Sequence, residues 1–466
     1  MPGHEVSWDQ QKPGRQNEMR LAKYHCWLAA ILLAGMFFVS PIPQTTALRN
    51  LFLLGLLAMF AFLWRAGHAE RPSFAAVSRN AEMLALGALT LWMFIHTVLW
   101  AHDRSASLGD FSGEWLGSLL VAGIGYGIVR RLSSARDCAT LLVGTIALAL
   151  FAHAAWTLGF QGMKWLQTGN YELGSTPYAN YAYLSTPINM AVALLAADLA
   201  TRWVGDGKLL PWSTNVTRIL LGVTTLAVVA IKARNGVITV FAVLVLLGIL
   251  VAWREWKRSK SHKGTVAAML ALVLAAGLFS INLRTDPRWT TFTETVAIAW
   301  DVETHKAWLD KDKYPLPMLS SGELVEASAY DRIAWARVAL GGIASRPLGF
   351  GYGVEAYGHY VKTQYGGNAV SSHSGLLDFT LANGIPGLVL FVAFCVLLFR
   401  RGWLAWAASN PWGLALMLTL ANYCFRIVLD GHFGSFRLKM LALSLAIFYW
   451  LAIRKTEDRD IVRVER

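Results

Sequence analysis

The chain has 466 residues, of which 55% are hydrophobic and only 15% are charged. Soluble domains carry roughly 25% charged residues, so a soluble multidomain protein, a disordered chain and a fibrous repeat are excluded. The net charge of +13 would suggest nucleic acid in a soluble protein. In a chain this apolar, it raises instead the question of where the basic residues lie relative to a membrane.

Apolar runs long enough to cross a bilayer recur along the whole chain. A spanning helix needs about 20 mostly apolar residues. We predict twelve spans, centred on residues 26–39, 51–63, 81–100, 115–129, 138–158, 182–199, 219–231, 237–253, 266–281, 386–399, 412–428 and 440–453. No small-residue cleavage pattern follows the first run, so we expect it to be retained as a span. The predicted fold is an all-α integral membrane protein.

Basic residues indicate the orientation, because short cytoplasmic loops are enriched in Lys and Arg. With a cytoplasmic N-terminus, 25 of the 42 Lys and Arg residues fall in inside segments and eight fall in short outside loops. An even number of spans then places both termini in the cytoplasm. The basic run from Arg254 to Lys263 lies inside and is expected to contact lipid headgroups.

The predicted organisation has five parts. They are a cytoplasmic tail (1–25), nine spans (26–281), a large helical outside loop (282–372), three spans (373–453) and a second cytoplasmic tail (454–466).

The four cysteines, Cys26, Cys138, Cys395 and Cys424, lie in or beside apolar runs. They show no CxxC spacing and no pairing within a polar loop. We therefore predict neither a disulfide framework nor a zinc site.

The outside loop has 91 residues, too many for a structureless connection. Residues 291–306 are expected to form an amphipathic interfacial helix. Ser328-Ala-Tyr-Asp331 resembles a capping box and predicts a helix over residues 330–344. The glycine-rich run 349–353 lacks the Lys-Ser/Thr of a phosphate-binding loop, so a tight turn at the membrane surface is favoured. Asp310-Lys-Asp312 could hold a divalent metal, but a solvated turn is favoured.

Several function classes have no support in the sequence. No Walker A motif, dinucleotide-binding glycine fingerprint or His-Glu-x-x-His motif occurs. ATP-driven transport, redox chemistry with a Rossmann cofactor and zinc proteolysis are therefore not indicated. Transporters are often built from inverted repeats, and we find no internal repeat.

A few polar residues lie where they are costly or chemically useful. Arg234 lies in a very short outside turn between two spans, against the topological bias. A snorkelling interfacial arginine is the alternative. We favour phosphate binding, because Arg-Asn-Gly at a helix start can present a guanidinium and backbone N–H groups. His373 lies where the polar loop returns to apolar sequence, and an imidazole there can act as a base near pH 7.

Three segments resemble motifs of one family, the O-antigen ligase and O-antigen polymerase-like superfamily. His373-Ser-Gly-Leu-Leu-Asp-Phe-Thr-Leu-Ala-Asn-Gly384-Ile-Pro-Gly is similar to its signature, in which a His precedes a Gly before an Ile/Leu-Pro-Gly turn. Arg234-Asn-Gly-Val-Ile238 resembles its arginine-containing turn. Arg332-Ile-Ala-Trp335, followed by Arg346-Pro-Leu-Gly-Phe-Gly-Tyr-Gly353, resembles its Arg-x-x-Trp and Pro-x-Gly-x-Gly segment.

The resemblance implies twelve helices with a periplasmic helical loop. It also implies transfer of a glycan from undecaprenyl diphosphate at the periplasmic face of the bacterial inner membrane. In the ligase branch, the acceptor is a sugar hydroxyl of the lipid A–core oligosaccharide in lipopolysaccharide biosynthesis. No metal, nucleotide or other cofactor is implied; membrane lipids are expected partners and nucleic acid is not. O-antigen polymerase and protein O-oligosaccharyltransferase remain alternatives within the superfamily, and a lipid-linked glycan transporter is the alternative from another class.

The resemblance also suggests roles for individual residues. We expect His373 to act as the general base, and Arg234 and Arg332 to hold the donor diphosphate during an inverting single displacement. The remaining candidates for substrate binding are Arg337, Arg346, Arg426 and Asp430. For the last two, an ion pair inside the membrane is the alternative.

Overall fold

The computed structural model describes residues 13–66, 80–132, 136–169, 176–231, 233–259, 262–285, 290–351, 353, 355–367, 371–431 and 435–464. Residues 1–12 of the predicted N-terminal tail and the last two residues of the predicted C-terminal tail lie outside these ranges. Within them no strand forms, and one isolated antiparallel bridge joins Met318 and Leu324. The prediction of an all-α fold is confirmed.

Along the chain, the described helices are α1 (Pro13–Val39), α2 (Thr46–Ala66), α4 (Ala81–Trp100), α5 (Arg104–Asp110), the π-helix η1 (Phe111–Leu116), α6 (Gly117–Leu132), α7 (Arg136–Thr168), α8 (Tyr181–Trp203), α9 (Thr214–Ala230), α10 (Arg234–Ser259), α11 (His262–Thr285), α12 (Phe292–Trp300), α13 (Ala327–Ser345), α14 (Glu355–Tyr365), α15 (Gly375–Ala407), α16 (Trp412–Leu429) and α17 (Ser435–Val464).

Every predicted apolar run coincides with a helix, the fourth with η1 and α6 together. Eight helices of the described chain are long and apolar enough to cross a membrane, and three shorter apolar helices cover residues 23–39, 214–230 and 269–281. The described helices therefore have the length and composition of an integral membrane protein. The count of twelve crossings remains a prediction.

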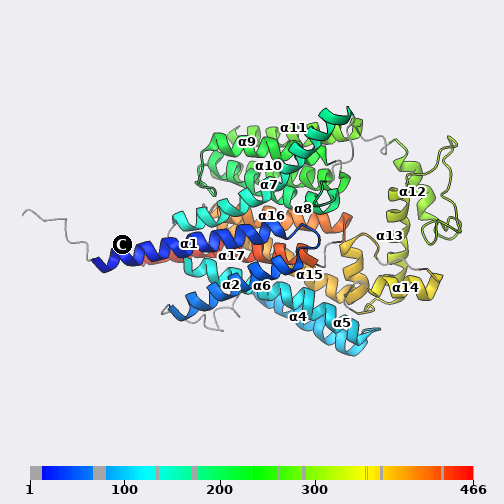
Figure 1. Cartoon of the computed structure of the whole chain (residues 1–466), viewed down its shortest axis with the longest axis horizontal. Coiled ribbons are helices and arrows are strands. Elements are labelled where there is room, and N and C mark those ends of the chain that lie inside the picture. Colours follow the sequence, from blue (N-terminus) through cyan, green and yellow to red (C-terminus); the bar gives the residue numbers. More distant parts are fainter. Residues whose placement is uncertain are drawn as a thin grey trace, which may run out of the picture.

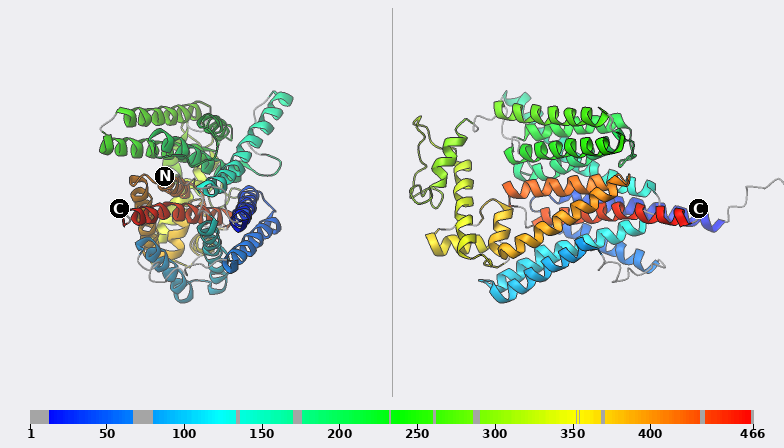
Figure 2. Two further views of the ribbon diagram at one scale, coloured as in Figure 1. Left: turned by 90° about the vertical axis from the view of Figure 1, so that its left-hand side faces the viewer. Right: turned by 180° about the vertical axis from the view of Figure 1, so that it is seen from behind.

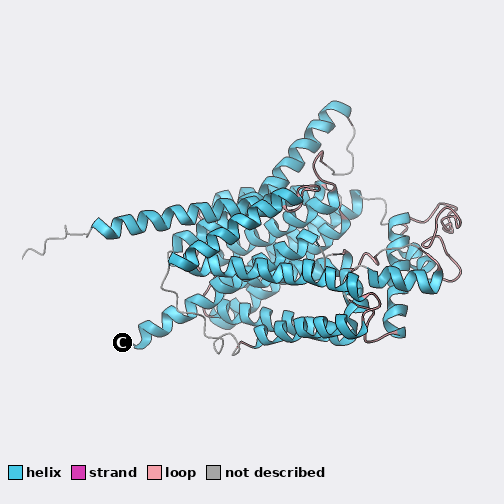
Figure 3. Ribbon diagram, turned by 60° about the horizontal axis from the view of Figure 1, so that its bottom comes forward, coloured by secondary structure: helices cyan, strands magenta, loops and turns pink. Residues whose placement is uncertain are grey.

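The long helices form a bundle, and α12, α13 and α14 gather beyond one of its ends (Figure 1). The view from behind in Figure 2 shows the same separation. We call the described residues of 290–371 the loop domain. The described start of α1 and the end of α17 lie at the opposite end of the bundle. Figure 3 shows that the described irregular segments are concentrated in the loop domain and at helix ends.

The loop domain has its own apolar core, which includes Tyr330, Ala334, Val338 and Val361. Two predicted details of the loop domain are wrong. The helix expected over residues 291–306 is shorter: α12 ends at Trp300, because the chain enters a series of turns there.

The second detail concerns the start of α13. The helix begins at Ala327, and its N-cap is Glu326 rather than Ser328. The Glu326 carboxylate accepts a hydrogen bond from the Ala329 N–H at 2.7 Å and is also held by Arg234. The long-range partner thus fixes a capping residue that the local capping-box pattern does not identify.

A turn of the loop domain completes the hydrogen bonding of a broken helix, α15. In an unbroken helix the N–H of residue 386 would bond the Ala382 carbonyl, but Pro386 has no N–H. The N–H of Gly351 donates to that carbonyl at 2.8 Å, and the N–H of Phe350 donates to the Leu381 carbonyl at 2.9 Å. The Gly349 N–H donates to the Arg346 carbonyl at 2.8 Å and closes a turn at the start of the glycine-rich run, so that the next two N–H groups bond α15. The predicted position of this run at the membrane surface remains a prediction.

Two glycines allow this close approach. Gly384, at the kink of α15, has φ 72°, and Gly349, in the turn, has φ 90°. A Cβ atom on Gly384 would lie 2.6 Å from the Pro347 carbonyl oxygen, and one on Gly349 would lie 2.5 Å from the Ala382 oxygen. The glycines of two separate sequence motifs therefore serve one packing contact.

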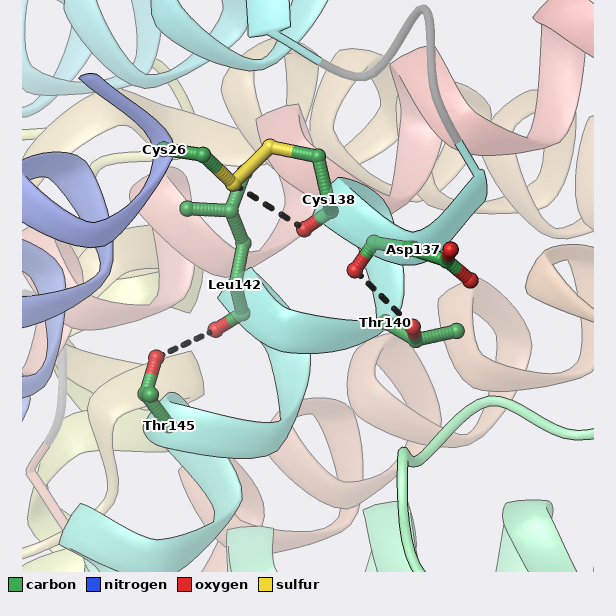
Figure 4. The surroundings of a disulfide bond; sticks show 6 residues. All are labelled: Cys26, Asp137, Cys138, Thr140, Leu142 and Thr145. Carbon is green, nitrogen blue, oxygen red and sulfur yellow. Dashed lines mark hydrogen bonds between the residues drawn. A yellow bond between two sulfur atoms is a disulfide. The ribbon is translucent and has the colours of Figure 1, made fainter. Parts of the chain in front are cut away.

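The prediction of no disulfide is wrong, because Cys26 and Cys138 are bonded, with their Cα atoms 6.0 Å apart. Figure 4 shows the bond joining two neighbouring helices, α1 and α7. The two cysteines are separated by 112 positions, so local spacing contains no signal for their pairing. Cys395 and Cys424 are free thiols.

The expectation that Arg254 contacts lipid headgroups is also wrong, because its side chain is buried within the protein. It forms an ion pair with Asp206, which includes an Nη2–Oδ1 hydrogen bond of 2.8 Å, and its guanidinium lies 4.4 Å from the Trp406 ring centroid. A buried charge is costly unless it is paired, and Asp206 supplies that partner from the loop after α8.

Candidate functional site

The start of α10 is fixed by contacts with three other segments. Arg234 Nη2 donates to a Glu326 carboxylate oxygen at 2.9 Å, and both side chains are largely buried. Asn235 Nδ2 donates to the Leu429 carbonyl at 2.7 Å, at the end of α16. Asn189 of α8 donates to the Gly236 carbonyl at 3.0 Å. The turn predicted to bind phosphate is therefore held in place by the loop domain and by two bundle helices.

Arg332 brings α13 to the same place. Its Nη1 donates to Asn235 Oδ1 at 3.1 Å. Trp335 follows on the next turn of α13 and donates from Nε1 to the Trp308 carbonyl at 3.1 Å. Its ring stacks on the His373 imidazole, with centroids 5.0 Å apart and planes 18° apart. Arg332 and Trp335, three residues apart on α13, thus connect Asn235 to His373.

His373 lies in a strained turn, and its side chain is exposed. Its φ is 56°, a left-handed conformation that non-glycine residues seldom adopt. The His373 N–H donates to Ser371 Oγ at 3.0 Å. The Asp378 carboxylate accepts from the Ser371 hydroxyl at 2.7 Å and from the Ser372 N–H at 2.9 Å. Asp378, in the first turn of α15, therefore holds the conformation of the histidine turn.

The surroundings keep His373 neutral near pH 7. Partial burial against its neighbours lowers the pKa of the imidazole below 6.5, and the positive charge of Arg332 lowers it further. The carboxylates of Asp430, Asp378 and Asp331 act in the opposite direction, with smaller total effect. A neutral imidazole has one ring nitrogen that can accept a proton.

Arg426 and Asp430 form the ion pair that the sequence left as an alternative. The buried Arg426 guanidinium donates to Asp430 Oδ2 at 3.2 Å and to the Ser185 hydroxyl. The Asp430 carbonyl accepts the Gly375 N–H at 3.1 Å, two residues after His373. The pair is therefore next to the histidine turn, and Asp430 influences the pKa of His373.

The two other candidate arginines lie elsewhere. Arg337 stacks over the Trp300 ring at 5.8 Å, on the side of α13 that faces α12. Arg346 lies at the far end of α13, where it stacks over Phe350 at 5.0 Å. The structure brings together Arg234, Arg332, His373, Arg426 and Asp430, and it places Arg337 and Arg346 outside that group.

The Asp-Lys-Asp segment has the geometry of a turn. Asp310 Oδ1 accepts the N–H groups of Asp312 and Lys313 at 3.0 and 3.4 Å, and Asp310 pairs with the Lys313 ammonium at 3.3 Å. No cluster of three or more potential metal ligands occurs among the side chains that the structure describes.

Sequence reasoning missed Glu326 and Asp378, which touch the arginine turn and the histidine turn respectively. Each had a weak signal, since Glu326 lies two residues before the predicted capping box and Asp378 lies in the first turn after the Ser-Ser-His-Ser segment. Without a known partner, an acidic residue at a helix start is explained by the helix dipole alone.

An apolar cavity of about 470 Å³ lies among α4, α6, α15, α16 and α17. Its lining includes Trp115, Phe391, Leu398 and Tyr423. Tyr423 precedes Arg426 by one turn of α16. The cavity and the polar group around Arg426 therefore share helix α16, although Arg426 itself does not line the cavity.

A protein-family model described as O-antigen ligase matches residues 219–392. The matched segment contains Arg234, Arg332 and His373, and it ends just after the kink of α15. Comparison with curated proteins found no match. Residues 219–392 are therefore similar to the O-antigen ligase family, in agreement with the resemblance of the three motifs.

Proposed function

We propose that the protein is an O-antigen ligase, which transfers a glycan from undecaprenyl diphosphate to a sugar hydroxyl of lipid A–core oligosaccharide. The observation that carries the proposal is the convergence of Arg234, Arg332 and His373 at one end of the bundle. Their positions are fixed by Glu326 and Asn235 and by the stacked Trp335. The family match over the same residues supports this reading.

The proposed reaction needs one proton acceptor and a stabiliser for the leaving group. The acceptor hydroxyl gives its proton to neutral His373 while its oxygen attacks the anomeric carbon. The bond from that carbon to the diphosphate breaks, and its electron pair stays on the diphosphate oxygen. This single displacement inverts the anomeric centre. General base catalysis of this kind contributes typically 10²–10⁴-fold.

The two arginines are suited to the charge that develops on the diphosphate. Electrostatic stabilisation is strongest when the donors are in place before the reaction. Glu326 accepts from one nitrogen of Arg234, and Asn235 accepts from one nitrogen of Arg332, so each guanidinium plane is oriented. A guanidinium carries five N–H donors. The donor is already activated by its diphosphate, so the proposed step uses neither ATP nor a metal.

The donor's long apolar tail needs an apolar site near the diphosphate. The cavity beside Tyr423 and Phe391 offers one, a helical turn away from Arg426. The distribution of basic residues along the sequence supports an orientation with this end in the periplasm and both termini in the cytoplasm of a bacterium.

The proposal is tested with purified protein in liposomes that contain undecaprenyl-diphosphate glycan. Lipid A–core, a second lipid-linked glycan and a pilin-like protein are offered in separate reactions. Product on lipid A–core alone supports a ligase. Product only on the second lipid-linked glycan would identify a polymerase, and product only on the pilin a protein O-glycosylase.

Two variants and a chelator test the mechanism in the same assay. His373→Ala should abolish transfer while the protein stays folded in the membrane, and normal product would overturn the assignment of the base. Arg234→Lys should be impaired, because one ammonium does not reproduce a planar guanidinium. EDTA should leave the rate unchanged; loss of transfer would return Asp310 and Asp312 to consideration.

A further inference from the structure

A second group of basic side chains lies at the end of α13 that is far from His373. We call Arg346, His102, His359 and Lys362 the distal basic cluster. The rings of His102 and His359 stack with centroids 3.2 Å apart and planes at 20°. Arg346 Nη2 donates to the Trp100 carbonyl at 3.0 Å. The cluster therefore joins the end of α4, the end of α13 and the middle of α14.

The groups in this cluster repel one another electrostatically. Partial burial lowers the pKa of His359, and the neighbouring His102, Arg346 and Lys362 lower it further, in that order. All three neighbours are basic. Among the side chains that the structure describes, no ion pair joins Arg346 or Lys362 to a carboxylate.

The nearest acidic residues of α5 have other contacts. Asp103 is the N-cap of α5 and accepts the Ala106 N–H at 3.0 Å. Asp110 lies against Gly353 at the other end of the helix. A converging set of partly exposed basic groups that pairs with none of the described carboxylates is suited to an anion, and planar guanidinium groups suit phosphate in particular.

The distal basic cluster and His373 lie along the same helix, α13, at a distance that an oligosaccharide can span. Arg346 follows Trp335 by 11 positions. At 1.5 Å per residue, the two lie about 16 Å apart along α13, and Trp335 stacks on His373. In Figure 1, α13 lies across the end of the bundle rather than along it. An extended oligosaccharide can reach from one end of α13 to the other over the same surface.

We propose that the distal basic cluster binds a phosphate group of the acceptor glycolipid while the acceptor hydroxyl lies at His373. This inference rests on the proposed function and adds the chemical group that the acceptor must carry. A membrane phospholipid also has a phosphate, so the experiment must separate the two sources.

The experiment measures binding of lipid A–core to the full-length protein in detergent, by thermophoresis, without any donor. The same acceptor is used before and after enzymatic removal of its phosphates. The variant is His359→Gln with Lys362→Gln, because Arg346 also contacts the turn that docks on α15. Lys313→Gln is the matched control, since this exposed lysine pairs with Asp310 in another part of the loop domain.

We expect the double variant to raise the Kd for the phosphorylated acceptor roughly tenfold, about 1.4 kcal/mol. Dephosphorylated acceptor should bind wild type and variant equally weakly, and the control should match wild type. Equal Kd values for the two acceptor forms on wild type would overturn the proposal. So would a loss of affinity only for phosphatidylglycerol vesicles, which would identify a lipid headgroup site.

The two proposals can fail separately. Binding is measured without catalysis, so a wild type that binds phosphorylated acceptor through the cluster but transfers no glycan would refute only the ligase function. A wild type that transfers glycan equally well to phosphorylated and dephosphorylated acceptor, with unchanged KM, would refute only the phosphate site.

Discussion

Replacing Gly384 by alanine tests whether the loop domain depends on the kink of α15. At φ 72° and ψ 178°, a backbone region essentially confined to glycine, alanine costs roughly 1–3 kcal/mol. The new Cβ would also lie 2.6 Å from the Pro347 oxygen and closer still to the Leu348 carbonyl. These contacts are backbone atoms that cannot rotate away, and overpacking of this kind costs typically 1–3 kcal/mol more. The expected total is about 2–6 kcal/mol.

Gly366→Ala is the matched control, because Gly366 also has φ 72° but a Cβ there would meet nothing within 4 Å. It measures the cost of alanine at the same positive φ where no contact opposes the new Cβ. Both variants are unfolded in detergent and followed by the fluorescence of the 20 tryptophans. Gly384→Ala should lose clearly more free energy of unfolding than Gly366→Ala, and should lose transfer activity. Equal losses would refute the argument that backbone contact at the kink holds the turn in place.

Three further predictions follow from the site and from the disulfide. Arg332→Gln should move the acid limb of the pH–rate profile to higher pH, because Arg332 lowers the pKa of His373 and the base must be unprotonated; an unchanged limb would contradict the coupling. Dithiothreitol should lower the Tm of wild type but not that of Cys26→Ser, since a disulfide contributes typically 2–4 kcal/mol. Glu326→Gln should reduce kcat about tenfold or more by releasing Arg234, with the helix content measured by circular dichroism retained.

The apolar runs were sufficient to predict the long bundle helices, because a membrane span is defined by a local property, about 20 consecutive apolar residues. A turn at the start of the run 349–353 was also predictable from its glycines. The start of α13 at Ala327 was not, because its N-cap Glu326 is selected by a partner 92 positions away, Arg234. Local propensity carries no information on such a pair.

Long-range contacts explain the other differences. The Cys26–Cys138 bond depends on α1 packing against α7. Arg254 is buried because Asp206 reaches it from the loop after α8. For the candidate site residues, the sequence identified the chemical type and predicted the side of the membrane. The packing of α13 across the end of the bundle determines which candidate residues lie close together. Arg332 lies near His373, whereas Arg346 lies at the other end of α13.

The segment of α15 before its kink has a mechanical consequence for the site. Phe379 belongs to the apolar core of the bundle, whereas Leu381 and Ala382 belong to the core of the loop domain. The two cores therefore share one short stretch of helix directly after His373. A hinge motion between the two cores would have to pull apart packed side chains, so the cores hold the histidine turn in one position. In the proposed reaction, the binding energy of the donor is then not consumed in closing the site and remains for the chemical step.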